Sequence, residues 1–327
     1  MNIKRNINPK EICDQIKKGN ITALSKAITL SESNIDSDQE LANKILAKLK
    51  TKNNDSIRIG ITGVPGAGKS TFIESFGNHI TNLGLKLAVL TIDPSSSVTK
   101  GSILGDKTRM ETLSANKNVF IRPSPASNFQ GGVGKNTRES IFLCESAGYD
   151  IILIETVGVG QNEISVAEMV DFFLLLKISG SGDELQGIKR GIIEMSDLIA
   201  INKCDGDNVK DSIKAKNEFK LALQLFPKKK SNWKPQVLTC SSLTGDGLAE
   251  IWECITNYVN LTKKNNYFYE NRINQNKSWL LQIIDYSLRK SFFNRKSIKI
   301  KLNNLIKKIE EQKISIFEAS RKILSEI

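Results

Sequence analysis

A glycine-rich loop constrains this chain more than any other part of its sequence. Residues 63–70 read GVPGAGKS, and they follow a short apolar run at 57–61 that suits a buried strand. The next segment, 71–84, has the pattern of a helix. Glycines let a backbone turn with positive φ, so that successive N–H groups point at phosphate oxygens. The pattern predicts a strand–loop–helix unit that cradles phosphate at the positive end of its helix.

The loop also carries side chains that suit a nucleotide. Lys69 supplies a positive charge for the β- and γ-phosphates and is also a predicted catalytic residue. Ser70 supplies a hydroxyl for Mg²⁺. The predicted nucleotide contacts of this loop are Gly63, Val64, Pro65, Gly66, Ala67, Gly68, Lys69, Ser70 and Thr71.

A second motif predicts which base is bound. Asn202, Lys203, Cys204 and Asp205 follow the apolar run 198–202, and loops after parallel strands are where nucleotides bind in doubly wound sheets. Asp205 can accept hydrogen bonds from the N1–H and the exocyclic amino group of guanine. Adenine has no matching donors at these positions. We therefore expect GTP and GDP as ligands. The predicted base contacts are Asn202, Lys203, Asp205, Ser241 and Ser242.

Apolar runs alternate with helix-like segments through the middle of the chain. The runs cover 57–61, 87–93, 119–122, 151–156, 172–178, 198–202 and 236–240. This alternation predicts an α/β fold, a doubly wound and mostly parallel sheet with helices on both faces. We divide the chain into an N-terminal helical extension (1–54), a P-loop GTPase domain (55–262) and a C-terminal helical dimerisation arm (263–327).

The C-terminal arm carries apolar stripes at helical spacing. Leu281, Ile284 and Leu288 share one helix face, and a second face carries Leu302, Leu305, Ile306 and Ile309. Such stripes are buried either against the same chain or against a second copy, and the pattern leaves both options open.

Acidic residues at the ends of predicted strands are candidates for the Mg²⁺ site. Asp93 and Glu155 end apolar runs, and Asp106 lies near the start of a helix-like segment. Mg²⁺ keeps several waters and takes one or two carboxylates, so these three acids cannot all be direct ligands. The predicted metal residues are Ser70, Asp93, Asp106 and Glu155, with Ser70 as a direct ligand.

Hydrolysis of GTP requires little covalent chemistry, because a positioned water and neutralised charge are sufficient. The candidates for this work are Glu155, Asp106, Arg109, Gln161 and Lys69, and the sequence does not decide which of them positions the water. Gly158 is a candidate for sensing the γ-phosphate through its N–H. His79 is the only histidine, which argues against a Ser-His-Asp site.

Composition narrows the class further. The five cysteines are scattered, the first residues lack an apolar secretory core, and no apolar run reaches the length of a membrane span. We expect a cytoplasmic protein that is not a membrane protein. The net charge of +12 permits nucleic-acid binding, but the basic stretches also suit solvated helix faces, so we rank that role low.

With these motifs identified, the chain resembles the MeaB/ArgK group of P-loop GTPases, which are associated with methylmalonyl-CoA mutase. The matching strings are GVPGAGKST at Gly63, IDPSSS at Ile92, GSILGDKTRM at Gly101, FIRPSPAS at Phe120, ETVGVGQ at Glu155, MVDFFLLL at Met169 and GDELQGIKRG at Gly182. Similar proteins tend to have a proline near Ser179 and an alanine at Cys204 and at Ser242.

The resemblance implies a GTPase chaperone that gates cofactor delivery to an adenosylcobalamin-dependent acyl-CoA mutase. It places Asp93, Asp106 and Glu155 in the Mg²⁺ and switch apparatus and 183–189 in a segment that couples nucleotide state to the mutase. It also implies a homodimer formed through the C-terminal helices.

Three other functions compete with this interpretation. A metallochaperone GTPase needs paired soft ligands, which one histidine and five dispersed cysteines do not supply in any evident way. An ATP-dependent kinase linked to amino-acid transport conflicts with the guanine motif. A non-catalytic scaffold that binds GTP for structure shares every motif with a slow GTPase, and the sequence leaves it open.

Overall fold

The computed structural model describes residues 8–49, 55–93, 110–125, 132–156, 162–180 and 190–325. A seven-stranded sheet with the order β3-β2-β4-β1-β5-β6-β7 lies at its centre, and every strand pair is parallel. The strands are β1 (Ile57–Gly63), β2 (Leu87–Asp93), β3 (Val119–Pro125), β4 (Ile151–Glu155), β5 (Phe172–Ile178), β6 (Leu198–Asn202) and β7 (Gln236–Thr239). The predicted doubly wound fold is confirmed, and the sheet is wholly parallel.

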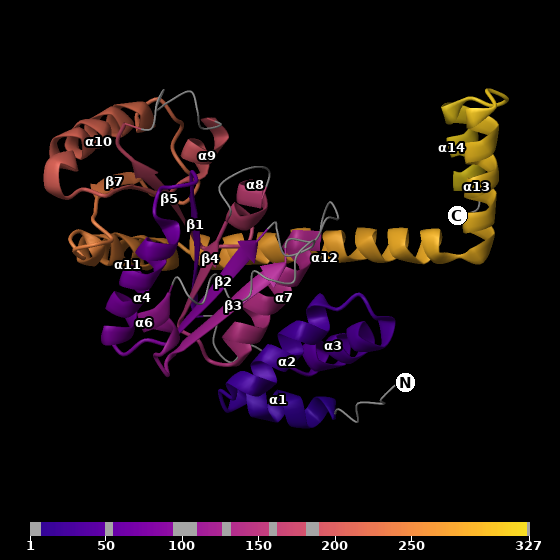
Figure 1. Cartoon of the computed structure of the whole chain (residues 1–327), viewed down its shortest axis with the longest axis horizontal. Coiled ribbons are helices and arrows are strands. Elements are labelled where there is room, and N and C mark those ends of the chain that lie inside the picture. The colour runs from indigo at the N-terminus through magenta and orange to yellow at the C-terminus, as the bar shows by residue number, and fades with distance from the viewer. Residues whose placement is uncertain are drawn as a thin grey trace. The chain divides into compact units, whose positions relative to one another are not determined.

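Helices occupy most of the remaining chain (Figure 1). They are α1 (Pro9–Lys17), α2 (Ile21–Glu32), α3 (Asp36–Lys48), α4 (Lys69–Asn82), α6 (Glu111–Ser114), α7 (Gly132–Ser146), α8 (Asn162–Ala167), α9 (Arg190–Met195), α10 (Val209–Leu223), α11 (Leu248–Lys264), α12 (Tyr267–Asn294), α13 (Lys296–Glu310) and α14 (Ile316–Leu324), with a 3₁₀ turn η2 (Gly206–Asn208).

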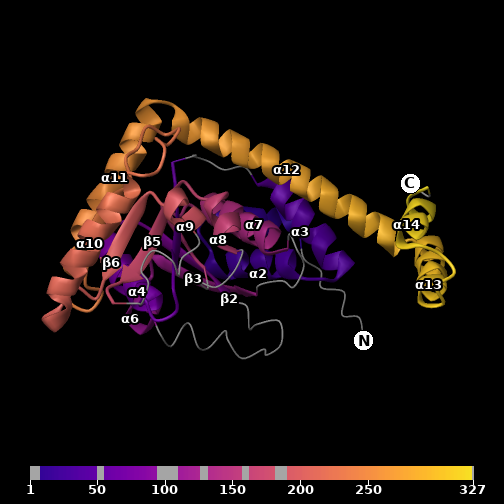
Figure 2. The same ribbon diagram turned by 90° about the horizontal axis from the view of Figure 1, so that it is seen from above.

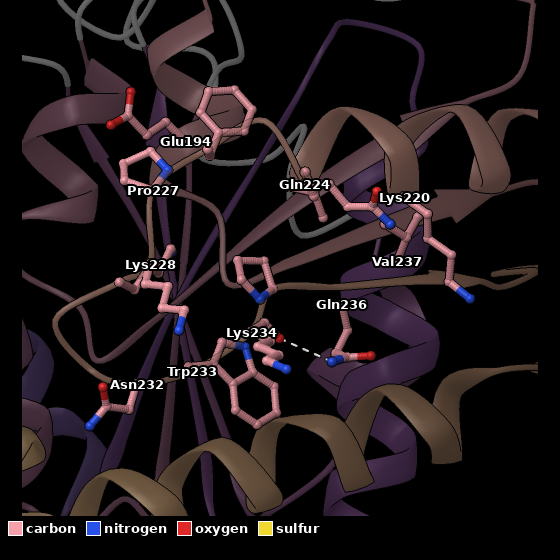
Figure 3. A pocket seen from close by; sticks show the side chains of 14 residues that line it. Glu194, Lys220, Gln224, Pro227, Lys228, Asn232, Trp233, Lys234, Gln236 and Val237 are labelled. Carbon is pink, nitrogen blue, oxygen red and sulfur yellow. Dashed lines mark hydrogen bonds between the residues drawn. The ribbon is translucent and has the colours of Figure 1, made fainter.

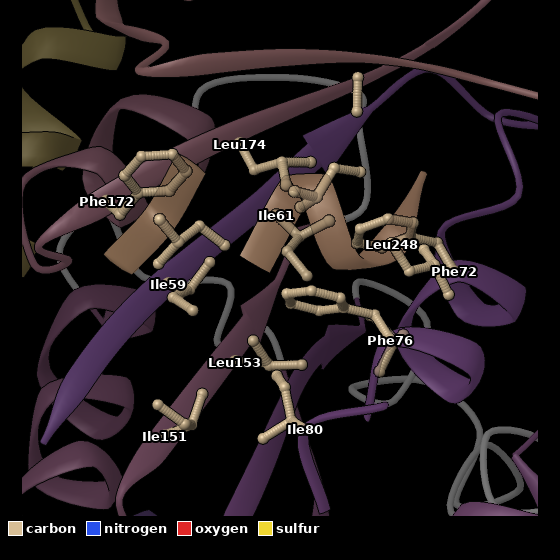
Figure 4. Close-up of a cluster of buried hydrophobic side chains, with 14 of the residues drawn as sticks. Ile59, Ile61, Phe72, Phe76, Ile80, Ile151, Leu153, Phe172, Leu174 and Leu248 are labelled. Carbon is tan, nitrogen blue, oxygen red and sulfur yellow. The ribbon is translucent and has the colours of Figure 1, made fainter. Parts of the chain in front are cut away.

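One face of the sheet packs on α4, α6 and α11 (Figure 4). Alternate residues of β1 and β4, such as Ile59, Ile61 and Leu153, meet Phe72 and Phe76 of α4 there. The two phenylalanine rings stack with centroids 5.2 Å apart. These strands are covered on both faces, which is why they read as continuous apolar runs.

The opposite face packs on α7 and α8 at one end and on α9 and α10 at the other. Gly60 of β1 faces this side, and a Cβ there would lie 2.8 Å from the ring of Phe173. Helices α1 to α3 join the same cluster through α7, beside which α2 lies in both views (Figures 1 and 2). Asn8 and Asn20 cap α1 and α2 by accepting hydrogen bonds from main-chain N–H groups.

Two arginines fasten the amino ends of β1 and β5 to helices. Arg58 of β1 pairs with Glu145 of α7 at 2.7 Å, and Arg272 of α12 pairs with Asp171 at 2.6 Å. The Arg272 guanidinium also lies 4.4 Å from the ring centre of Phe268. Arg272 and both carboxylates are buried, so charge pairing and hydrogen bonding offset the cost of their desolvation.

The chain divides into two compact units, residues 1–275 and 276–327. In the second unit α13 and α14 pack on each other through Ile298, Leu305, Ala319 and Ile323. The boundaries predicted near residues 54 and 262 stay predictions. Among the described helices, none is long and apolar enough to cross a membrane.

Candidate functional site

The sheet order brings the two sequence motifs to the same end of the sheet, where the strands have their carboxyl ends. Strand β5 pairs with β1 on one side and with β6 on the other, and Gly63, Leu176 and Asn202 lie near the carboxyl ends of these strands. Residues 64–68 follow β1 and residues 203–205 follow β6, so the two loops emerge at the same end of the sheet, on either side of β5. The site is therefore built from segments that are more than one hundred residues apart in the chain.

The phosphate loop has the backbone that its glycines allow. Gly66 has φ of +83° and Gly68 of +85°, and the N–H of Ala67 donates to the carbonyl of Val64 at 3.1 Å. Gly63 is required for space, because a Cβ there would lie 2.3 Å from the carbonyl oxygen of Leu176. Gly68 is the N-cap of α4, so the free N–H groups of that helix begin at the loop.

Lys69 lies within the loop. Its Nζ donates to the carbonyls of Gly63 at 2.8 Å and Val64 at 3.3 Å. Burial lowers the pKa of Lys69, and the negative charges of Glu155 and Glu163 oppose that shift. A desolvated ammonium held at a loop of main-chain N–H groups can neutralise phosphate charge more strongly than an ammonium in water.

Asn202 joins the phosphate loop to the base loop, which comprises residues 203–205 after β6 and residues 240–242 after β7. The side chain is 1% exposed. Its Nδ2 donates to the Ala67 carbonyl at 2.9 Å, and its Oδ1 accepts from the Ser242 N–H at 3.1 Å and the Ser242 hydroxyl at 2.8 Å. One buried amide thereby holds together three segments that the sequence predicts to contact the nucleotide.

The base loop is shaped around Asp205. Lys203 has a positive φ of +60°, and its carbonyl accepts from Asn208 Nδ2 at 2.7 Å. The Ser241 hydroxyl donates to the Asp205 carboxylate and accepts from the N–H groups of Leu243 and Thr244. Ser241 is fully buried whereas Asp205 is partly exposed. This arrangement orients a carboxylate that can still accept hydrogen bonds from guanine.

The remaining predicted residues fall in four groups. Glu155 ends β4, next to β1, where it pairs with Ile61, and Ser70 lies in the first turn of α4. Val64, Pro65 and Thr71 lie in the loop and the start of α4 as predicted. Asp93 ends β2, although its side chain is outside the described part. Asp106, Arg109, Gly158 and Gln161 lie outside the described residues.

Two residues beyond the predicted set belong to the site. Glu163, in the first turn of α8, is 2% exposed and acts electrostatically on Lys69. Glu163 lies two residues after Gln161, which is a predicted catalytic candidate. This closeness in the sequence is the signal that could have identified Glu163. The Ser75 hydroxyl of α4 donates to the Ser242 carbonyl at 2.5 Å, which no sequence pattern indicates.

The described residues do not form a cluster of three or more His, Cys, Asp or Glu side chains that would hold a metal. The polar groups that the described part of the site offers are main-chain N–H groups, the half-buried Lys69, hydroxyls, the Asn202 amide and the carboxylates Glu155, Glu163 and Asp205.

A parallel sheet with this phosphate loop after its central strand and an Asn-Lys-x-Asp loop beside it defines the class of P-loop GTPases. The family model described as methylmalonyl Co-A mutase-associated GTPase MeaB matches residues 24–297, and the chain belongs to this family. The protein is accordingly a GTPase that binds guanine nucleotides.

Individual relatives agree with this assignment. The GTPase ArgK of Escherichia coli is 46% identical over 266 residues, which are 81% of this chain and 80% of ArgK. The mouse methylmalonic aciduria type A homolog, a mitochondrial protein, is 43% identical and aligns over 89% of this chain and 73% of its own. A crystal structure of a protein named LAO/AO transport system kinase superposes with a TM-score of 0.75 at 34% identity, with 98% of each chain covered.

Proposed function

We propose that this GTPase is a switch that protects an adenosylcobalamin-dependent acyl-CoA mutase, of the methylmalonyl-CoA mutase type, and gates its cofactor loading. The observation that carries the proposal is the family match over residues 24–297, because the description of that family names the mutase. The name of the mouse relative points to the same area of metabolism.

The site supports a switch because Asn202 couples its parts. The buried amide bonds to the phosphate loop through Ala67 and to the base loop through Ser242. A nucleotide that contacts both loops is therefore bound by one connected unit, and the identity of the base affects how the phosphates are held. Binding energy from the base can thereby contribute to phosphate positioning.

Hydrolysis in this site depends on placement and charge. Lys69 gives up its contacts with the Gly63 and Val64 carbonyls and reaches the β- and γ-phosphates. Glu155 positions a water at the end of β4, and Asp106, Arg109 and Gln161 are further candidates for that work. This division of labour needs no covalent intermediate.

The residues present fit Mg²⁺, which binds oxygen donors and few carboxylates. The Ser70 hydroxyl lies in the first turn of α4, and the Glu155 carboxylate ends the neighbouring strand β4. Ser70 would hold the ion directly, with Glu155, Asp93 or Asp106 holding its waters. When bound, the ion neutralises the charge of the phosphate oxygens.

A homodimer formed through the C-terminal helices is part of the proposal. Four apolar side chains of α12 are between 45% and 67% exposed: Leu280, Leu281, Ile284 and Leu288. They recur at helical spacing, so they form one apolar stripe that a second copy can cover. The proposed assembly is the GTPase dimer with its mutase client.

Single-turnover GTP hydrolysis, with the protein alone and with the mutase of the same cell, tests this function. We expect the rate to rise roughly ten-fold or more with the mutase, which corresponds to about 1.4 kcal/mol of barrier. The Lys69→Ala variant should bind the mutase and show no such rise. An unchanged rate in the presence of the mutase would remove the proposed client and leave the GTPase assignment.

A parallel assay with ATP tests the alternative of a kinase linked to amino-acid transport, which the name of the similar crystal structure favours. We expect weak ATP binding, because Asp205 would face an adenine that offers it no matching donors. Tight ATP binding that survives Asp205→Asn would establish the alternative instead.

A further inference from the structure

A hollow of about 760 Å³ lies at the edge of the sheet away from the nucleotide. It is lined by the last turn of α10, the segment 226–235 and the first residues of β7, with Glu194 of α9 at its rim (Figure 3). Gln236 and Val237 belong to the amino end of β7, whereas the base loop follows the carboxyl ends of β6 and β7. The hollow and the nucleotide site are therefore at opposite ends of these two strands.

We propose that this hollow binds an extended acidic segment of a partner protein. The lining carries three lysines with exposed side chains, Lys220, Lys228 and Lys234, against one acid, Glu194. Within the described part of the chain, none of the three lysines forms an ion pair. Their positive charge is available to carboxylates from outside the molecule.

The walls of the hollow are held in place before any partner binds. Lys229 Nζ donates to the carbonyls of Met195 and Ser196 and to the Asp197 carboxylate, each at 2.7 Å. The Trp233 indole N–H donates to the Asp197 carbonyl at 2.9 Å. The positive charge of Lys229, the fourth lysine of the lining, is thus neutralised by Asp197. Lys229 and Trp233 attach the segment that carries Lys228 and Lys234 to the start of β6.

The distribution of charge favours a segment over a small anion. In Figure 3 the ammonium groups of Lys228 and Lys234 lie on the same side of the hollow as the Trp233 ring, and Lys220 lies on the other side, near Val237. Glu194 lies beside Pro227, away from the indole. Lysines that are spread around a hollow match several carboxylates along a chain, whereas a single phosphate needs donors that converge.

The apolar lining and the sheet edge favour a protein over a nucleic acid. Six apolar residues line the hollow between the lysines: Leu223, Phe226, Pro227, Trp233, Pro235 and Val237. They offer contacts for aliphatic side chains, and three lysines are few for a surface that binds phosphate backbones. Strand β7 is the last strand of the sheet, and edge strands accept an added extended segment.

Fluorescence anisotropy with labelled synthetic peptides tests the proposal. The probe is a peptide in which aspartate and glutamate alternate with leucine and valine, because alternate side chains of an extended segment face the same way. We expect it to bind the full-length protein, with affinity that falls as salt is raised. The same peptide with asparagine and glutamine in place of the acids should bind at least roughly ten-fold more weakly.

A triple variant, Lys220→Gln with Lys228→Gln and Lys234→Gln, should lose roughly ten-fold or more of the affinity for the acidic peptide. The matched control changes three exposed lysines of the N-terminal helical region, Lys18, Lys26 and Lys44, to glutamine. It alters net charge equally and should change affinity less than about two-fold. GTP hydrolysis by both variants alone should equal that of the unmodified protein, which shows that they are folded.

Two results would overturn the proposal. One is that the acidic peptide fails to bind the unmodified protein, or binds the triple variant with the same affinity. The other is single-stranded polyuridylate that binds more tightly than the peptide and is lost in the triple variant, which would make the hollow a nucleic-acid surface. Neither result depends on the mutase, so the proposed client is tested separately.

Discussion

At the scale of single residues, the buried amide of Asn202 holds the nucleotide site together. Asn202→Ala leaves the Ala67 carbonyl and the Ser242 N–H without a partner, which costs about 1–3 kcal/mol. We expect the affinities for GTP and GDP to fall roughly ten-fold or more, as measured by titration calorimetry. The half-buried Asn78, whose Nδ2 donates to the Thr112 hydroxyl at 2.9 Å, provides the control, and Asn78→Ala should change neither affinity.

A second residue-scale prediction concerns pH. Burial raises the pKa of Glu139 to about 7, although Lys135 lies 3.8 Å away. At a pH between 4.5 and about 7 this carboxyl is therefore protonated in the folded protein and ionised in the unfolded chain. Between the usual pKa of 4.5 and about 7 the folded state binds more protons than the unfolded chain, so the free energy of unfolding falls as pH rises through that range and levels off above it. Glu139→Gln keeps the neutral form at every pH.

Urea unfolding at two pH values checks the Glu139 prediction. We expect Glu139→Gln to raise the free energy of unfolding by about 3 kcal/mol at pH 8 and to change it little near pH 4. An equal effect at both pH values would contradict the prediction, because it would show that the glutamine acts through packing and not through charge.

At the scale of elements, the junction between β1 and α4 depends on Gly68. Its φ of +85° disfavours any side chain, and a Cβ would lie 2.8 Å from Asn202 Nδ2. We expect Gly68→Ala to abolish measurable GTP binding, because it strains the loop and displaces the amide that joins the two loops.

Gly84, just after α4, is a matched control for that substitution. It has nearly the same φ, +83°, and nothing lies within 4 Å of a Cβ built there. Gly84→Ala should therefore cost about 1 kcal/mol of stability from backbone strain alone and leave GTP binding unchanged. If both variants lost binding equally, strain and not the contact with Asn202 would be the cause.

The attachment of α12 to the sheet is also an element-scale feature. Arg272→Met removes the partner of the buried Asp171 and should lower the free energy of unfolding by about 3–5 kcal/mol, as measured by urea unfolding. Lys263→Met breaks a pair with Asp55, which is 67% exposed, and should cost less than about 1 kcal/mol. A small effect for Arg272→Met would mean that Arg58 compensates for the missing charge.

At the scale of the whole molecule, the apolar stripe of α12 carries the proposed homodimer. Leu281→Glu combined with Ile284→Glu places two charges in that stripe, and we expect sedimentation analysis to show a monomer. Gln282→Glu, at an exposed position between them, should leave the dimer intact. A double variant that still dimerises would place the interface elsewhere.

Much of the fold and part of the site followed from local sequence patterns. Each predicted strand is present, and the residues 63–71 form the loop and helix start that their glycines indicated. The sequence did not predict Glu163 or Ser75 as site residues. The burial of Glu163 depends on how α8 packs, and the hydrogen bond from Ser75 to Ser242 depends on how α4 packs. The hollow beside β7 was likewise invisible in the sequence, where its lysines read as a solvated basic stretch.

The sequence by itself determined the chemistry of this protein: the phosphate loop, the guanine loop, the parallel sheet and membership of its family. Glycines and apolar periodicity act within a few residues, so a single stretch of chain can reveal them. Only the tertiary structure decided the strand order that sets β5 between β1 and β6, the position of Asn202 between two loops, and the pairing of Arg272 with Asp171. Each of those features includes at least one contact between residues about one hundred or more positions apart, and packing and desolvation select such contacts when the whole chain folds.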